Sequence, residues 1–299
     1  MSFPMALTRG LLSIAPLKAA WQSASRTPEK TDAPVPGWLR RLCEVETLLV
    51  GGFPVTVLTP RRGPSGAQLV YLHGGAYVHP LLGAHWSIIG GLIRRTGVTV
   101  WVPSYGLAPE HTVDEAYPLL QEVQRRATDR ARITEHTHPV FVAGDSAGGG
   151  LAVGLALRCR DEGISAAAAL FLFSPWLDVT LSNPAIDALE ADDPMLDRAE
   201  LIDDGVLWAA ERGTADPLVS PLNADRAELA ELPPLHLYQG TADILLADAK
   251  LFAARAGGAG AEVTLRIYPG AIHVFVGAPW TPEAHRALAD VAQRMHALT

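Results

Sequence analysis

The sequence predicts an α/β fold in which a mostly parallel sheet carries helices on both faces. Two observations predict it. From residue 67 onward, short apolar runs typical of buried strands alternate with longer runs of helical spacing, which is the pattern of parallel strands joined by helices. Of the 299 residues, 48% are hydrophobic and 19% are charged, so the chain can bury a large core and wholesale disorder is excluded. We therefore expect a single domain over residues 1–299.

The elements follow in order along the chain. An amphipathic helix is expected at the start, and a loop over residues 26–37, which are rich in proline and charge. "VETLLV" and "PVTVLT" flank Gly51 and Gly52, which predicts a hairpin. Later strands are predicted at "AQLVYLH", "VTVWVPS", "HPVFVAG", "AAAALFLFS", "PPLHLYQG" and "AEVTLRIYP". Helices are predicted at "HWSIIGGLIRRT", "VDEAYPLLQEVQRRATDR", residues 146–160, "ILLADAKLFAARA" and "TPEAHRALADVAQRMHAL".

One segment interrupts this alternation. From about Asp178 to Pro221 the sequence has short helical patches between proline-bearing turns and no convincing strand. We interpret residues 178–221 as an insertion that forms a helical cap together with the N-terminal residues, about 1–45. Trp21, Trp38, Leu207 and Trp208 are candidates for lining a pocket under this cap, although a buried structural role is equally compatible with each.

Composition excludes several function classes. The chain has 24 Lys and Arg against 32 Asp and Glu, a net charge of −8, so nucleic-acid binding has no electrostatic support. No run approaches the roughly 20 apolar residues of a membrane span, and we expect no stable membrane insertion. Cys43 and Cys159, the only cysteines, form neither a zinc motif nor a disulfide framework. This favours a reducing compartment and a cytoplasmic location.

A glycine-rich turn follows one predicted strand. Gly144-Asp145-Ser146-Ala147-Gly148 matches G-x-S-x-G, with apolar residues before it and a helical pattern after it. The serine of such a turn sits on strained backbone so that its hydroxyl projects, and the flanking glycines approach too closely for larger residues. A phosphate-binding loop is the alternative interpretation, but no Walker lysine follows. Ser146 is therefore the candidate nucleophile.

A second glycine pair ends an earlier strand. His73-Gly74-Gly75-Ala76 resembles the H-G-G-G loop whose N–H groups bind a tetrahedral oxyanion. We assign the N–H groups of Gly74 and Gly75 as donors, with the N–H of Ala147 as the third, and a bracing role to His73.

A serine nucleophile requires a base, and the base requires an orienting acid. His273 lies in a loop after a predicted strand and satisfies the chain order Ser, Asp or Glu, His. Asp243 follows the strand "LHLYQG" and is the expected acid, with Asp248 as the alternative one turn further on. A helix N-cap is the structural role that Asp243 could also fill.

Several motifs occur in one order between Val70 and Phe275: "HGGAYV", "SYGLAPEH", "VAGDSAGG", "FSPWLD", "DPLVSPL", "LPPLHLYQGTADILLAD" and "AIHVFVG". With them the sequence resembles the hormone-sensitive-lipase-like carboxylesterases, the bacterial family IV esterases of the α/β-hydrolase superfamily. The resemblance places Ser146, Asp243 and His273 at the triad positions. It implies an α/β-hydrolase fold with an eight-stranded sheet, a helical cap, and hydrolysis of short- to medium-chain acyl esters without a cofactor. A small-molecule ester is the expected partner, and a homodimer is a family-level expectation.

The chain departs from the family pattern twice. Ala76 stands where many members have a third glycine, and Gly106 stands where the family's Y-R-L-A-P-E motif carries arginine. Two enzymatic alternatives keep the same triad, an amidase such as a formamidase and a lactone hydrolase. A ligand-binding receptor on the same fold is the non-enzymatic alternative, although such proteins typically lose a triad member.

Overall fold

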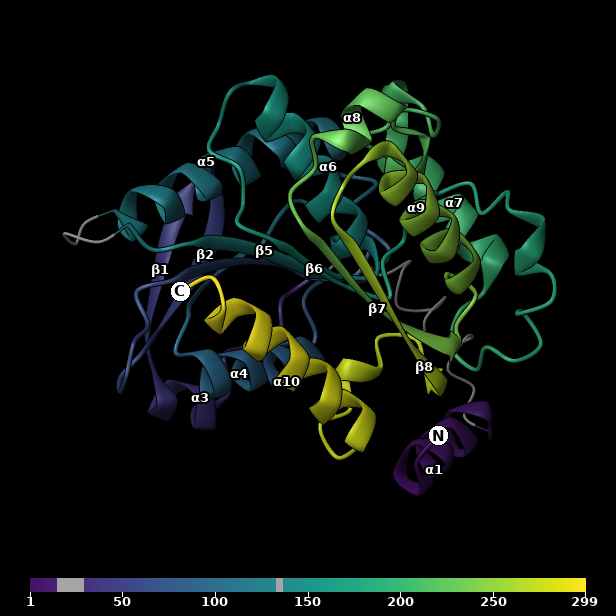
Figure 1. Ribbon diagram of the computed structural model, residues 1–299, viewed down its shortest axis with the longest axis horizontal. Helices are drawn as coiled ribbons and strands as arrows, with labels where there is room; N and C mark the ends of the chain where they lie inside the picture. The colour runs from purple at the N-terminus through teal and green to yellow at the C-terminus, as the bar shows by residue number, and fades with distance from the viewer. Residues whose placement is uncertain (15–29, 133–136) are drawn as a thin grey trace.

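The computed structural model describes residues 1–14, 30–132 and 137–299. Within them the chain forms an eight-stranded sheet in the order β1-β2-β4-β3-β5-β6-β7-β8 (Figure 1). Strand β2 is antiparallel to both of its neighbours, and all other pairings are parallel. This confirms the predicted mostly parallel sheet. The strands are β1 (Cys43–Val50), β2 (Phe53–Pro60), β3 (Gln68–Leu72), β4 (Thr99–Pro103), β5 (Val140–Asp145), β6 (Leu170–Phe173), β7 (Leu235–Ala242) and β8 (Val263–Ile272).

Helices cover both faces of the sheet. Figure 1 shows α5, α6, α8 and α9 on one face and α3, α4 and α10 on the other, with α1 and α7 at the end near β7 and β8. No helix in the described part of the chain combines the length and the apolar character that crossing a membrane requires. The helices are α1 (Phe3–Ile14), α3 (Gly37–Leu42), α4 (Gly83–Thr96), α5 (Val113–Ala131), α6 (Ala147–Asp161), α7 (Arg198–Ala209), α8 (Arg226–Ala230), α9 (Leu246–Ala259) and α10 (Pro282–His296).

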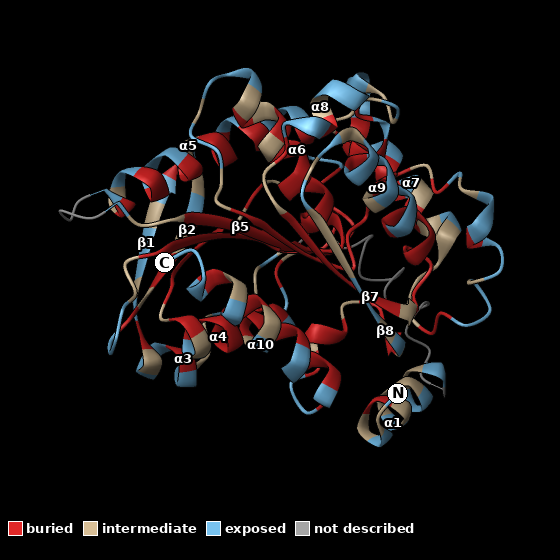
Figure 2. Cartoon of the chain, in the orientation of Figure 1, coloured by how far each residue is buried: buried red, intermediate tan, exposed pale blue. Residues whose placement is uncertain are grey.

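The central strands are buried on both faces, as Figure 2 shows for β5. Because side chains alternate along a strand, Val70 and Leu72 of β3 enter one apolar cluster, and Leu69 and Tyr71 enter the other. Two buried faces explain why these strands read as continuous apolar runs. At the sheet edge, Gly51 and Gly52 both have positive φ, 56° and 90°, which confirms the predicted hairpin between β1 and β2.

The insertion lies between β6 and β7 and contains no strand, as predicted. It carries the short helices η1 (Pro184–Ile186), η2 (Ala210–Arg212) and η3 (Pro221–Asn223) in addition to α7. Asp197 caps α7 by accepting hydrogen bonds from the N–H groups of Ala199 and Glu200. Strand β1 begins at Cys43, close to the end of the N-terminal segment, about 1–45, that is expected to join the cap.

Helix α1 is fastened to the C-terminal helix. The backbone N–H and the hydroxyl of Ser2 donate to the Glu283 carboxylate at 2.7 and 2.6 Å, and the Trp280 indole donates to the Thr8 hydroxyl at 2.9 Å. Met5 on the inner face of the helix is fully buried. These contacts hold the expected amphipathic helix against the body of the protein.

Candidate active site

Ser146 lies on a sharp turn between β5 and α6. Its backbone has φ 51° and ψ −122°, a region that costs a non-glycine residue about 1–3 kcal/mol. A Cβ atom on Gly144 would lie 2.1 Å from the carbonyl oxygen of Gly148. The predicted need for glycine at both positions is therefore confirmed by this close approach.

Backbone hydrogen bonds hold the turn in this strained form. The Ser146 N–H donates to the Phe173 carbonyl at 2.9 Å, and the Ser146 carbonyl accepts from the N–H groups of Gly149 and Trp176, each at 2.9 Å. Neighbouring strand β6 thus fixes the direction in which the Ser146 hydroxyl projects.

The hydroxyl meets an imidazole that follows β8. His273 Nε2 lies 3.0 Å from Ser146 Oγ, and His273 Nδ1 lies 3.0 Å from Asp243 Oδ2. Because an ionised carboxylate only accepts, Nδ1 carries the proton and Nε2 is left to accept the serine proton. The three side chains are buried, with Asp243 fully inaccessible. The structure thus brings together the three residues predicted from separate parts of the sequence.

Two further donors orient the acid. Asp243 Oδ2 also accepts from Gln239 Nε2 at 2.7 Å, and its Oδ1 accepts from the Leu245 N–H at 2.9 Å. Asp248, the alternative acid, instead accepts from Asn183 Nδ2 at 2.9 Å, and burial raises its pKa to about 6. The local environment therefore favours Asp243 as the partner of the imidazole.

Acidic neighbours control the pKa of His273. Burial alone would lower this pKa, but the charge and hydrogen bond of Asp243 outweigh burial, and the charges of Asp193 and Asp145 act in the same direction. The pKa of His273 is consequently raised above the ordinary histidine value. A raised pKa makes the imidazole a stronger base toward the serine hydroxyl.

The glycine loop after β3 runs directly against the serine. A Cβ on Gly74 would lie 2.9 Å from Ser146 Cβ, and Gly75 has φ 119°. None of the N–H groups of Gly74, Gly75 and Ala147 donates a hydrogen bond within the described residues. Ala76, in the third position of the motif, has φ 52°, a left-handed conformation in which glycine has no steric penalty.

Two stacked aromatic residues brace the start of this loop. The His73 ring stacks on Tyr105 with 4.4 Å between centroids, and the Tyr105 hydroxyl donates to the His73 carbonyl at 2.7 Å. Burial is the main reason that the pKa of His73 is lowered to about 4. A neutral, stacked ring agrees with the bracing role expected for His73.

Sequence reasoning missed a polar network beneath the nucleophile. Asp145 accepts from the Tyr71 hydroxyl at 2.6 Å and pairs with His85 Nε2 at 3.3 Å. Burial alone would raise the pKa of Asp145, but the two partners outweigh it and lower this pKa. Tyr71 is 74 residues away along the chain, so no local signal identifies the network.

A cavity of about 320 Å³ opens onto Ser146 and His273. Its walls come from α1, from the start of α4, from the insertion and from the loop before α10, and none of its lining residues in the described chain is lysine or arginine. Apolar contributors include Leu12, Leu82, Ile88, Met195, Leu196, Leu201 and Trp280. Of the predicted lining candidates, Trp38, Leu207 and Trp208 do not line it, and Trp21 lies outside the described residues.

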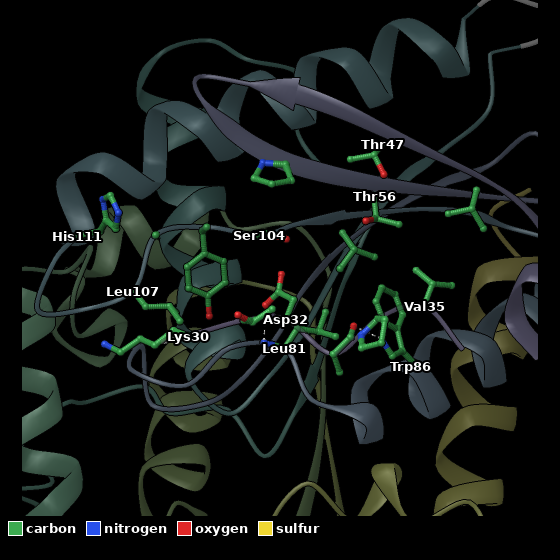
Figure 3. Close-up of a pocket in the computed structure, with 18 of the residues that line it drawn as sticks. Lys30, Asp32, Val35, Thr47, Thr56, Leu81, Trp86, Ser104, Leu107 and His111 are labelled. Carbon is green, nitrogen blue, oxygen red and sulfur yellow. Dashed lines mark hydrogen bonds between the residues drawn. The ribbon is translucent and has the colours of Figure 1, made fainter. Parts of the chain in front are cut away.

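A second cavity, of about 690 Å³, lies between residues 30–35, the β1–β2 hairpin and residues 104–111 (Figure 3). Asp32 accepts from the Leu81 N–H at 2.9 Å, and the Trp86 indole donates to the Ala33 carbonyl at 2.8 Å. These bonds hold residues 30–35 along the cavity wall.

Gly106, where the chain departs from the family pattern, lines this cavity beside His111. A Cβ there would lie 2.3 Å from the His111 ring, so His111 occupies the space that a side chain would need. Lys30 supplies a cation nearby, since its ammonium donates to the Ala108 carbonyl and pairs with Glu110 at 3.2 Å. Within the described residues, no group of three or more His, Cys, Asp or Glu side chains is arranged to hold a metal ion.

Comparisons with known proteins agree with this geometry. A model of the α/β-hydrolase fold family matches residues 69–277, and the chain belongs to that family. It is 33% identical to an esterase of Acinetobacter venetianus over 77% of this chain and 75% of the relative. It is 30% identical to an acetyl-hydrolase of Streptomyces hygroscopicus over 81% of this chain and 79% of the relative.

Solved structures similar to this chain indicate which kind of α/β-hydrolase it is. A crystal structure of the esterase EstE5 soaked with p-nitrophenyl butyrate has a TM-score of 0.83 and 25% identity, covering 100% of this chain and 99% of that one. A bacterial hormone-sensitive lipase family esterase has a TM-score of 0.80 and 26% identity over the same shares. The protein is a carboxylic ester hydrolase of the hormone-sensitive-lipase-like type.

Proposed function

We propose that the protein hydrolyses short- to medium-chain acyl esters through an acyl-enzyme on Ser146. His273 takes the serine proton as the oxygen attacks the ester carbonyl, and Asp243 holds the imidazole and stabilises its positive charge. The N–H groups of Gly74, Gly75 and Ala147 bind the oxyanion. The alcohol leaves with the proton from His273, and water activated by the same imidazole releases the acid.

The observation that carries the proposal is the pair of 3.0 Å contacts joining Asp243 to His273 and His273 to Ser146. Unused N–H donors beside the hydroxyl support it, because a lost oxyanion donor costs about 3 kcal/mol of barrier. The substrate class is argued from the cavity. A volume of about 320 Å³ lies at the lower end of ligand pockets, about 300–1,000 Å³, and favours short acyl chains.

The roof of the cavity supports a cap role for two segments. Thr8 and Leu12 of α1 line one side, and Met195, Leu196 and Leu201 of the insertion line another. We assign these segments as the cap and expect substitutions in them to alter chain-length preference. The absence of lysine and arginine from the described lining favours uncharged esters over anionic ones.

Labelling and substitution test the proposal together. A fluorophosphonate is expected to attach to Ser146, as mapped by mass spectrometry, and Ser146→Ala should abolish both labelling and p-nitrophenyl butyrate hydrolysis while leaving the melting temperature within a few degrees. Retained turnover in the folded variant would refute the mechanism. An acyl-chain series from acetate to laurate measures the length preference, and anilide and lactone substrates measured beside it distinguish amidase and lactonase activity.

A further inference from the structure

A second carboxylate from the insertion lies beside the proposed catalytic acid. Asp193 is only 4% exposed, and its Oδ2 accepts from the N–H of Ile244 at 2.9 Å. Ile244 is the residue that directly follows Asp243. The insertion is therefore hydrogen-bonded to the turn that carries the acid.

The other oxygen of Asp193 binds the wall of the substrate cavity. Oδ1 accepts from the N–H groups of Met195 and Leu196, at 2.8 and 2.9 Å, and both of these residues line the cavity. Hydrogen bonds from N–H groups to an ionised carboxylate are stronger than those between neutral groups. One buried side chain thus connects the cavity wall to the acid turn through three such bonds.

The two carboxylates fix consecutive residues of the turn. Consecutive N–H groups, those of Ile244 and Leu245, bind Asp193 and Asp243 respectively. Without Asp193 the buried Ile244 N–H would lose its partner, and an unpaired buried donor is unfavourable. The turn would then reorient to recover a hydrogen bond, and Asp243 would move with it.

We infer that Asp193 is a positioning residue for ester hydrolysis, which clamps the Asp243 turn to the Met195–Leu196 wall so that the cavity and the imidazole are aligned together. The inference rests on the proposed triad. Asp193 does not hydrogen-bond His273, so its effect reaches the imidazole through the turn and through its charge.

The charge provides a readout that a purely structural role would not produce. The anionic groups that raise the pKa of His273 are Asp243, Asp193 and Asp145. Replacing Asp193 by a neutral residue removes one of them, so the pKa of His273 falls. The acidic limb of the kcat/KM profile should then move to lower pH.

The experiment compares Asp193→Asn with Asp192→Asn. Asp192 is the adjacent residue, but its side chain is 69% exposed and pairs with Arg9 on the surface. Hydrolysis of p-nitrophenyl butyrate is measured from pH 5 to 9, normalised to active sites titrated with fluorophosphonate. Asp193→Asn is expected to lower kcat by about 10- to 100-fold, the scale of a small misplacement at an active site, with KM nearly unchanged and the acidic limb shifted to lower pH. Asp192→Asn should match the wild type.

The inference would be overturned if Asp193→Asn had the wild-type kcat per titrated site and an acidic limb of its pH profile at the wild-type position. If the variant instead had fewer active sites that react with fluorophosphonate but an unchanged acidic limb of the pH profile, Asp193 would have a structural role only, and the inference would equally be overturned. If this variant does not fold, Asp193→Glu, which retains the charge but displaces the carboxylate, should lower kcat without moving the limb, and wild-type kcat there would be decisive against the clamp. Failure of the fluorophosphonate to label wild-type Ser146 would instead indicate that the proposed function is wrong.

Discussion

Gly148→Ala should separate the nucleophile turn from the oxyanion loop. A Cβ on Gly148 would lie 2.1 Å from the Leu72 carbonyl oxygen and 2.5 Å from that of His73. Since Cβ atoms essentially never approach within 3.0 Å of another heavy atom, the start of α6 must move away from the end of β3 by about 0.9 Å, the difference between 3.0 and 2.1 Å.

This displacement determines the expected loss. An oxyanion donor acts at about 2.7–3.1 Å, so a shift of this size takes the Ala147 N–H out of range. We expect kcat for p-nitrophenyl butyrate to fall by about 10²- to 10³-fold and stability to fall by about 1–3 kcal/mol from overpacking.

The assay pairs steady-state kinetics with thermal unfolding, and Gly257→Ala is the matched control. A Cβ at Gly257, in α9, meets nothing within 4 Å, so this change should leave kcat unaltered and add up to about 1 kcal/mol of stability. If Gly148→Ala retained wild-type kcat and melting temperature, the assignment of the Ser146 turn and of the Ala147 N–H as the third oxyanion donor would be incorrect.

Three further predictions follow from the described contacts. Because His273 must be neutral to act and its pKa is raised, kcat/KM should rise with pH through a midpoint above about 6.5, and a midpoint below that value would contradict the electrostatics. Burial raises the pKa of Asp204 to about 7. Because the folded state then holds this proton more tightly than the unfolded state, the free energy of unfolding falls as pH rises toward that pKa. Asp204→Asn should therefore increase the melting temperature relative to wild type at pH 8 but not at pH 4, and equal effects at both pH values would refute this. Trp208 is fully buried and stacks on Tyr77 with 4.4 Å between ring centroids. Trp208→Ala should therefore lower the free energy of unfolding by about 3–5 kcal/mol, measured by chemical denaturation. A loss below about 1 kcal/mol would contradict this, because it would mean that neighbouring residues fill the space left by the indole.

Features with a local cause could be predicted from the sequence. The two-glycine hairpin, the serine turn and the doubly buried strands each depend on neighbouring residues, and each was found where expected. Strand β8 is longer than predicted: it continues past Pro269 to Ile272. Proline is tolerated there because β8 is an edge strand, which the sequence alone does not reveal.

Features with a distant cause could not be predicted. Helices α3 and α8 have only six and five residues, too few to establish a helical period. Asp193 and Asp192 are identical in type and adjacent, and only the fold shows that one is buried against a turn 51 residues away while the other pairs with Arg9 at the surface. His85, on α4, likewise gains its partner, Asp145, from the end of β5.

The attachment of α1 has a practical consequence for handling the protein. Ser2 is bonded to Glu283, and Thr8 and Leu12, on the same helix, line the catalytic cavity. A peptide fused ahead of Ser2 would therefore extend the helix that contributes Thr8 and Leu12 to the cavity wall. The carboxyl end lies across the molecule near β1 (Figure 1), so purification tags and immobilising linkers belong at Thr299, away from that helix.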